Sequence, residues 1–151
     1  MVEVHDCASR NTQRDIHNKP ARYIMKLRIK DNTLRFRVSR SELARLLTSG
    51  RISSTIRFAP ALWAKWTYTL EHRPDKTSAT LEFKTTEVVV VLPAADVHVW
   101  SESEQVKIYE TCDLGDGEHL DLLVEKDFAC LDLSDADNED TFPNPAMEVA
   151  C

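Results

Sequence analysis

Glycine is scarce in this chain, with only three in 151 residues. Glycine-rich phosphate-binding loops and the G-x-S-x-G turn of hydrolases both need glycines at fixed spacing, and neither pattern occurs. The five histidines show no H-x-x-x-H or Cys/His spacing, so the sequence offers no recognised set of metal ligands. We therefore assign no catalytic residue, no metal site and no cofactor, and leave open whether the protein is an enzyme.

Paired cysteines and long apolar runs are also absent. The cysteines are far apart in the chain, at Cys7, Cys112, Cys130 and Cys151. Without a C-x-x-C pair, they indicate free thiols in a reducing compartment rather than a disulfide framework. The longest apolar run, Val88 to Leu92, is too short to cross a bilayer, and residues 1–24 lack the apolar stretch of a secretory signal. We expect a cytoplasmic protein with no membrane partner.

Acidic and basic residues are unevenly distributed along the chain. Residues 1–75 contain 15 Lys+Arg and 7 Asp+Glu, a charge of +8, whereas residues 76–151 contain 4 and 18, a charge of −14. In one compact domain these halves must lie side by side. Their attraction either holds them together, which is the simpler alternative, or leaves the basic half to meet an outside anion. A nucleic-acid partner is disfavoured, because the acidic half would repel the phosphate backbone.

The first half of the pattern predicts a hairpin, a helix and a second hairpin. Apolar and polar residues alternate from Lys26 to Lys30 and from Thr33 to Val38, on either side of a polar two-residue turn. Ser39-Arg-Ser-Glu42 has the form of a capping box, which indicates the start of a helix. Two further strands are predicted at 51–58 and 65–71, joined by a turn at 59–61 and with Trp66 buried.

The second half repeats this pattern 54 residues further along. Without gaps, the shift places Leu27 on Leu81, Leu34 on Val88, Ile52 on Val106 and Glu71 on Glu125. Strands are expected at 80–83, 88–92, 105–110 and 120–125, and a helix with a buried Trp100 starts at Pro93. We infer a duplicated ββαββ unit and an α+β fold of about eight mostly antiparallel strands with two helices.

The same pattern predicts the domain boundaries. We expect a single globular domain at 25–146, with repeat 1 at about 26–71, repeat 2 at about 80–125 and a C-terminal tail at 126–146. A flexible N-terminal extension at 1–24 precedes this domain, and a disordered tail at 147–151 follows it.

Two such units could close as a wide barrel or pack as two sheets. Closure would remove edge strands, which favours the barrel slightly. That barrel resembles the tunnel barrels of triphosphate-processing phosphohydrolases, at the level of fold alone. Their Glu-x-Glu-x-Lys signature is absent: Leu27-Arg-Ile-Lys30 and Leu81-Glu-Phe-Lys84 hold the lysines without the carboxylate pair, so no activity is carried over.

Three segments resemble a known family. They are Met25-Lys-Leu-Arg-Ile-Lys30, Val124-Glu-Lys-Asp-Phe-Ala-Cys-Leu131 and Phe142-Pro-Asn-Pro145. The chain is similar in these motifs to small, uncharacterised bacterial proteins that share a domain of unknown function. The resemblance covers about residues 25–146, implies a bacterial source and a single domain, and supplies no catalytic residues.

Two features of the tail are interpreted as structural. Cys130 is predicted to be a small buried packing residue, because a reactive thiol needs a base or cation nearby and its neighbours include Asp127 and Asp132. Residues 135–139 offer oxygens at alternating positions, as a calcium loop does. The glycine needed at the sixth position is replaced by Asp140, so we predict a solvated acidic loop.

The first hairpin carries the only charge cluster that local physics leaves unbalanced. In the predicted register Arg28 lies opposite Arg35 and Lys26 opposite Arg37, and like charges directly opposite destabilise a sheet. The four residues are therefore candidates for binding an anion. Internal neutralisation is the alternative. Its candidates are Glu82, at the repeat position of Arg28, Glu87, at that of Thr33, or other carboxylates of the acidic repeat.

Two functions from different classes remain open. The missing catalytic constellation favours a non-enzymatic binding or interaction module. The basic face favours a phosphohydrolase-like enzyme or a sensor that binds a phosphorylated small molecule in a basic barrel. The partner would be a protein in the first case and an anionic small molecule in the second.

Overall fold

The computed structural model describes residues 25–147. Its elements are β1 (Lys26–Lys30), β2 (Thr33–Val38), α1 (Arg40–Ser49), β3 (Arg51–Arg57), β4 (Lys65–Arg73), β5 (Thr80–Lys84), β6 (Glu87–Pro93), α2 (Ala94–Glu102), β7 (Lys107–Gly115), β8 (Glu118–Lys126) and the 3-10 turn η1 (Pro145–Met147). The extension predicted at 1–24 lies outside the described residues, as does all but the first residue of the tail predicted at 147–151.

The first hairpin and helix form as their local sequence predicts. Asp31 adopts a positive φ of 49° in the turn between β1 and β2, a conformation that Asp tolerates better than most residues. Ser39 and Glu42 form the predicted capping box, in which each side chain accepts a hydrogen bond from the backbone amide of the other. The helix ends at Gly50, whose left-handed φ of 74° suits glycine.

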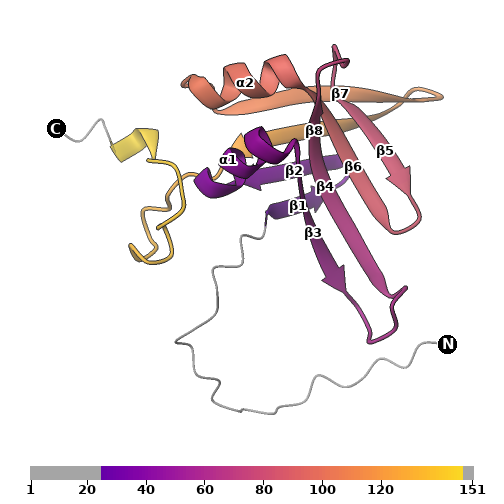
Figure 1. Cartoon of the computed structure of the whole chain (residues 1–151), viewed down its shortest axis with the longest axis horizontal. Helices are drawn as coiled ribbons and strands as arrows, with labels where there is room; N and C mark the ends of the chain where they lie inside the picture. The colour runs from indigo at the N-terminus through magenta and orange to yellow at the C-terminus, as the bar shows by residue number, and fades with distance from the viewer. Residues whose placement is uncertain (1–24, 148–151) are drawn as a thin grey trace.

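The eight strands form two four-stranded sheets (Figure 1). Sheet A has the order β1-β2-β8-β7, and sheet B has the order β3-β4-β6-β5. In each sheet the outer pairs are antiparallel hairpins, whereas the central pair, β2 with β8 or β4 with β6, is parallel. Each sheet thus combines one hairpin from each half of the chain. The predicted α+β class of eight mostly antiparallel strands and two helices is confirmed.

The preference for a closed barrel is wrong. Within residues 25–147 no strand of sheet A pairs with a strand of sheet B, so the sheets stay open and cross each other with their apolar faces inward. Side chains join them instead of backbone ladders. The rings of Phe36 and Tyr68 lie 6.3 Å apart between the sheets, and the Tyr68 hydroxyl donates to the Met25 carbonyl oxygen at 2.7 Å. These large side chains fill the interior and hold the strand edges apart.

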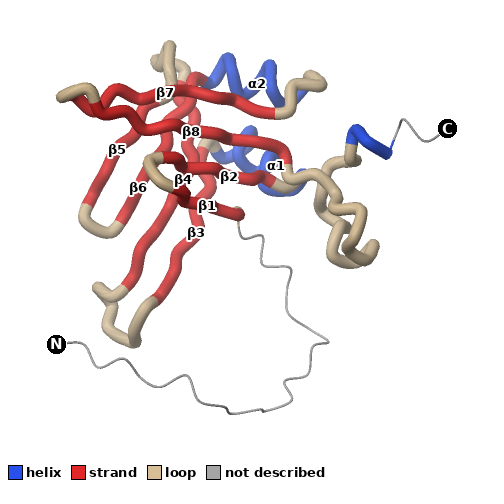
Figure 2. The backbone as a smooth tube through the Cα atoms, turned by 180° about the vertical axis from the view of Figure 1, so that it is seen from behind, coloured by secondary structure: helices blue, strands red, loops and turns tan. Residues whose placement is uncertain are grey.

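One hydrophobic cluster links both sheets and both helices. Phe36 on β2, Leu70 on β4, Leu46 on α1 and Trp100 on α2 are fully buried in it. Trp100 is therefore the core residue that its position predicts. Figure 2 shows the two helices on one side of the molecule, away from the β3–β4 and β5–β6 turns. The strand ends near those turns extend past the helices.

Strand pairing repeats at the 54-residue spacing seen in the sequence. Lys26 pairs with Arg37 in β1–β2, and the residues 54 positions later, Thr80 and Val91, pair in β5–β6. The parallel pairs correspond in the same way: Leu34 pairs with Leu122 in β2–β8, and Val88 pairs with Tyr68 in β6–β4. Of the eight strands, β7 is the one that departs from this spacing. Ile108 takes the place equivalent to Ile52, whereas the 54-residue shift would put Val106 there. The reason is that the connection from α2 to β7 is longer than that from α1 to β3. Descent from one duplicated unit stays a prediction.

The segment after β8 folds back onto α1. Phe128 and Phe142 form a parallel bridge, with their ring centroids 6.3 Å apart. Asp140 then caps the helix: its backbone oxygen accepts from the Arg40 amide at 3.0 Å, and its carboxylate accepts from the amide and hydroxyl of Ser41 at 3.0 and 2.5 Å. A carboxylate is stabilised there by the free amides of the first helical turn. This contact holds the acidic segment beside the domain.

Candidate functional site

The four predicted anion-binding residues share the outer face of sheet A. Arg28 on β1 lies opposite Arg35 on β2, and Lys26 lies opposite Arg37, in the predicted register. Their apolar neighbours Leu27 and Phe36 point to the other face, toward the core. The hairpin therefore concentrates positive charge on one surface.

The neighbouring strand β8 supplies a compensating carboxylate. Glu125 lies opposite Arg37, and its Oε1 is 2.8 Å from Nε of Arg37 and 2.7 Å from Nε of Arg35. Arg35 also donates from Nη2 to Oε2 at 3.0 Å. Burial by itself would raise the pKa of Glu125, but the hydrogen bonds and charges of the two arginines hold that pKa below its ordinary value of 4.5. Lys26 pairs separately, with its Nζ 2.6 Å from Asp127.

Neutralisation by carboxylates of the acidic half was predicted as an alternative, and Glu125 and Asp127 of that half pair with three of the four cations. The two partners named for it are not the ones that the structure uses. Glu82 and Glu87 lie on sheet B, where they pair at 2.9 Å with Arg73 and at 2.5 Å with Arg51. The exchange of hairpins between the two halves explains this. Because β5 and β6 join β4 rather than β1, their carboxylates never reach the basic hairpin.

Part of the basic face remains without a carboxylate partner. Among residues 25–147, neither Arg28 nor Lys30 forms an ion pair. Both line an open depression of about 450 Å³, together with Asp31, Thr33, Arg35 and Leu123. The structure thus divides the four candidates: Lys26, Arg35 and Arg37 meet carboxylates, whereas Arg28 lines the depression without one among residues 25–147.

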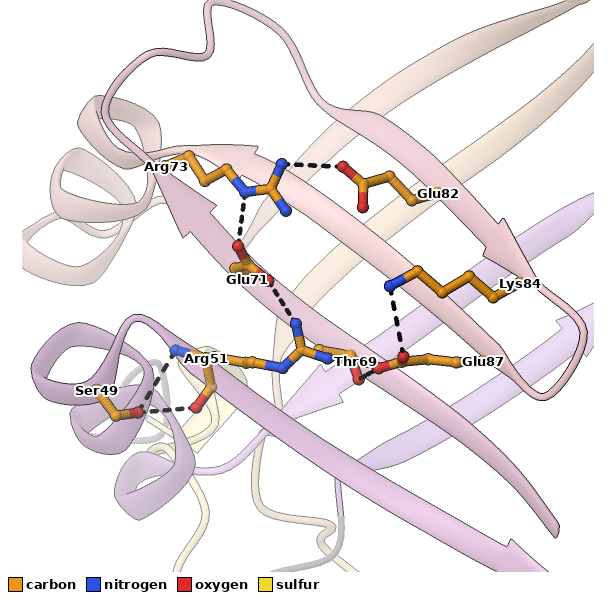
Figure 3. A network of polar contacts seen from close by, with 8 residues as sticks. All are labelled: Ser49, Arg51, Thr69, Glu71, Arg73, Glu82, Lys84 and Glu87. Atoms are coloured by element: carbon orange, nitrogen blue, oxygen red, sulfur yellow. Dashed lines mark hydrogen bonds and ion pairs between the residues drawn. The ribbon is translucent and has the colours of Figure 1, made fainter. Parts of the chain in front are cut away.

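Sheet B carries a second ion-pair network on its outer face, drawn in Figure 3. Glu71 on β4 accepts hydrogen bonds from Arg51 and Arg73, each at 2.6 Å, and Arg73 continues to Glu82. The pKa of Glu71 is held below its ordinary value, chiefly by the hydrogen bond from Arg73. Each arginine of this network already has carboxylate partners. We interpret it as a structural network that joins four strands.

The tail residues differ in part from their prediction. Cys130 is exposed rather than buried, since the chain turns outward after the Phe128 bridge. The acidic segment around it is a compact loop closed by Asn138, whose side chain bonds the amide and carbonyl of Cys130 at 3.0 and 2.9 Å. Asp140 is engaged with Ser41 at the start of α1.

Among residues 25–147 no three His, Cys, Asp or Glu side chains gather closely enough to hold a metal ion.

An apolar surface that the sequence did not predict lies at the end of sheet B that is farther from the two helices. The β3–β4 connection projects there (Figure 1), with Phe58, Leu62 and Trp63 exposed by 70%, 80% and 68%. Together with Thr85 and Thr86 of the β5–β6 turn, its residues line an open groove of about 490 Å³, formed by Phe58, Ala59, Trp63, Ala64, Lys65 and Trp66. We call Phe58, Leu62, Trp63 and Trp66 the apolar tip.

The apolar tip is held in place by backbone hydrogen bonds. Phe58 donates to the Ala64 carbonyl at 2.8 Å, Ala64 to Ala61 at 3.0 Å, and Lys65 to Trp63 at 2.9 Å. Trp66 is half-buried, and its ring packs 5.8 Å from that of Tyr68. A signal for this surface exists in the sequence. The connection Phe-Ala-Pro-Ala-Leu-Trp-Ala contains no polar residue, whereas hairpin loops ordinarily carry Gly, Asn, Asp or Ser.

Fold and surface together define an α+β domain of two mixed sheets with an ion-paired outer face on each and one exposed apolar end. The chain belongs to a family of unknown function (DUF7009), whose profile matches residues 25–146. The resemblance to a family with a domain of unknown function is thereby confirmed. No curated protein and no solved structure matches the chain. In the described part of the chain, no helix has the length and apolarity needed to span a membrane.

Proposed function

We propose that this protein is a non-enzymatic binding module that holds a segment of another protein at the apolar tip. The observation that carries the proposal is the exposure of Phe58 and Trp63 in the lining of one groove, with Leu62 exposed in the same connection. Large apolar side chains gathered on a surface cost free energy in water unless a partner covers them. Aromatic side chains in such a position also supply most of the energy in typical protein–protein contacts.

The charges around the groove indicate what kind of segment fits. Arg57 and Lys65 lie directly opposite each other at the end of the β3–β4 ladder, where like charges repel. Neither forms an ion pair within residues 25–147. A partner with carboxylates beside an apolar anchor would neutralise both cations and fill the groove. We therefore propose an acidic segment that carries a leucine or an aromatic residue.

Selection from a random peptide display library against the full chain tests this proposal. Enriched peptides should combine Asp or Glu with Leu, Phe or Trp. Trp63→Ala should weaken their binding at least about tenfold, equivalent to about 1.4 kcal/mol. Leu114→Ala is the matched control, because Leu114 is a similarly exposed apolar residue on β7, and it should leave the affinity unchanged.

Two results would overturn the proposal. One is the absence of enriched peptides, or enrichment of peptides that bind Trp63→Ala equally well. The other is sedimentation of the wild type, but not of Trp63→Ala, with vesicles of anionic phospholipid. Cations beside exposed tryptophan and leucine also suit a lipid surface, and that result would assign the tip to a membrane instead.

A second candidate function is an enzyme or sensor for a phosphorylated small molecule. It is supported by the depression beside Arg28 and Lys30, two cations that have no carboxylate partner among residues 25–147 and that line it together with Arg35. The anion would bind at Arg28, Lys30 and Arg35, with Lys26 and Arg37 at the margin. A thermal-shift titration with pyrophosphate tests this candidate, and a flat response would remove it.

A bacterial source, a cytoplasmic location and an internal duplication remain predictions. The widely spaced cysteines support the location, since Cys112 and Cys130 are both free thiols. The repeated strand registers support the duplication. The single domain at 25–146 is likewise proposed, supported by the one hydrophobic cluster that links both halves.

A further inference from the structure

The acidic loop at 131–140 has the chemistry that the apolar tip calls for. Leu131 and Leu133 are exposed by 62% and 51%, and the carboxylates around them are those of Asp132, Asp135, Asp137 and Glu139. The loop has a defined shape, because the Asn138 amide bonds the backbone of Cys130 and the Ser134 hydroxyl donates to Asp137 at 2.6 Å. It therefore presents two leucines on an ordered acidic surface.

The apolar tip borders a groove and is flanked by residues of the opposite charge. Its groove is lined by the rings of Phe58, Trp63 and Trp66 and by Lys65. Arg57 stands opposite Lys65 on the adjoining strand. Leucine side chains would fill the groove, and the flanking aspartates would face the two cations. The loop and the groove are thus complementary both in polarity and in charge.

A single chain cannot bring these two surfaces together. In Figures 1 and 2 the acidic loop lies beside α1, on the opposite side of the molecule from the β3–β4 connection. Asp140 and the Phe128–Phe142 bridge hold the loop in that place. The loop is therefore available only to the tip of another molecule.

We propose that the apolar tip of one copy of this chain binds the acidic loop of a second copy. Leu131 and Leu133 enter the groove, and the aspartates of the loop pair with Arg57 and Lys65. This inference rests on the proposed function, because it uses the same surface and names the partner that covers it. The contact is heterologous: the tip of one chain meets the loop of the next, so every chain keeps a second surface free for a further contact.

Analytical ultracentrifugation of the full chain tests the contact. The average mass of the wild type should rise with protein concentration. At about 1 M salt the rise should weaken, because the Debye length falls to about 3 Å and the pairing of aspartates with Arg57 and Lys65 is screened. A mass that stays monomeric at every concentration would overturn the inference. The peptide selection would still decide whether the tip binds other proteins, so the two failures are distinguishable.

Two variants identify the surfaces involved. Trp63→Ala should remove association from the tip side, and the double variant Leu131→Ser with Leu133→Ser should remove it from the loop side. Each variant keeps the surface that the other has lost, so an equimolar mixture should recover a one-to-one complex. Leu114→Ser, a change at an exposed leucine outside both surfaces, should associate as the wild type does.

Charge reversal provides a second test that keeps the apolar residues. Lys65→Glu should weaken self-association, and Asp132→Lys should do the same. Mixing these two variants should restore it, because the native tip of Asp132→Lys meets the native loop of Lys65→Glu. In the other contact of the mixture the two reversed charges attract. Association that survives in every single variant, or that fails to recover in both mixtures, would overturn the assignment of the loop as the occupant. A tip-to-tip dimer, for example, would be lost in Trp63→Ala and not recovered by mixing.

Discussion

Glu71 and Glu125 occupy equivalent positions on the two sheets, and each joins a pair of arginines. Glu71 on β4 binds Arg51 and Arg73, while Glu125 on β8 binds Arg35 and Arg37. The arginines do not correspond, because Arg35 and Arg37 come from the parallel neighbour whereas Arg51 comes from the hairpin partner. The carboxylate thus keeps its place on a strand of the central parallel pair, whereas its arginine partners differ between the sheets.

Glu125→Gln should destabilise the protein by about 1–3 kcal/mol, because it leaves Arg35 and Arg37 without their carboxylate partner. The arginines are partly exposed, so solvent limits the loss. Urea unfolding monitored by circular dichroism gives the free energy of unfolding. Glu104→Gln, at an exposed position after α2, serves as the control. A cost as small as that of Glu104→Gln would mean that Glu125 is dispensable for neutralising the hairpin.

The local parts of this fold could be predicted from the sequence because their causes lie within a few residues. The capping box needs only Ser39 and Glu42, and the first hairpin needs only an alternating pattern and a turn. The parallel pairing of β2 with β8 leaves no such local mark. For that reason the sequence could indicate that the basic hairpin needs carboxylates, but it could not identify Glu125.

The candidate site was predictable to a similar extent. The register of Arg28 with Arg35 followed from alternation, but which cation stays unpaired depends on β8. The apolar tip was overlooked because the segment 59–61 was interpreted as an ordinary turn. Its significance comes from tertiary structure: sheet B extends beyond the core, so apolar side chains on the inner face, such as Phe83, are left exposed.

Arg28 and Arg35 should respond differently to truncation. Arg28→Ala removes a like charge and no ion pair, so the free energy of unfolding should change by less than about 0.5 kcal/mol. Arg35→Ala takes a donor from Glu125 and should cost about 1–2 kcal/mol. If the depression binds anions, pyrophosphate should raise the melting temperature of the wild type and have little effect on Arg28→Ala. Equal responses in the wild type and both variants would exclude binding at this place.

Acid should destabilise the protein through the ion-paired carboxylates. The pKa values of Glu71 and Glu125 are held below their ordinary value of 4.5, so the stability they contribute is present above that pH. It is lost as the pH falls through the lower, folded-state values. Urea midpoints should therefore decrease below about pH 4.5, and the Glu125→Gln profile should be flatter there. A parallel profile for the variant would contradict the assigned ion pairs.

Glu42 should show the opposite pH dependence. Burial raises the pKa of this carboxyl above its ordinary value, and one oxygen, Oε1, has no hydrogen-bond partner within residues 25–147. Its favourable contribution is therefore present below the ordinary pKa and lost as the pH rises through the folded-state value. Glu42→Gln keeps an acceptor for the Ser39 amide but has no carboxyl group to titrate. The free energy of unfolding of the variant minus that of the wild type should therefore be larger at pH 7 than at pH 4. Glu42→Ala removes the acceptor and should cost about 0.3–1.5 kcal/mol.

The three tryptophans should separate stability from binding. Trp100 is fully buried, so Trp100→Ala should cost about 3–5 kcal/mol, whereas Trp63 is largely exposed and Trp63→Ala should cost less than about 0.5 kcal/mol. Trp66 was predicted to be a core residue, but it is half-buried between Tyr68 and the groove. Trp66→Ala should therefore lose an intermediate amount of stability and also weaken peptide binding. Unfolding and titration calorimetry on the same three variants measure both effects. If Trp63→Ala were as destabilising as Trp100→Ala, its ring would belong to the core, and the apolar tip would lose its role as a binding surface.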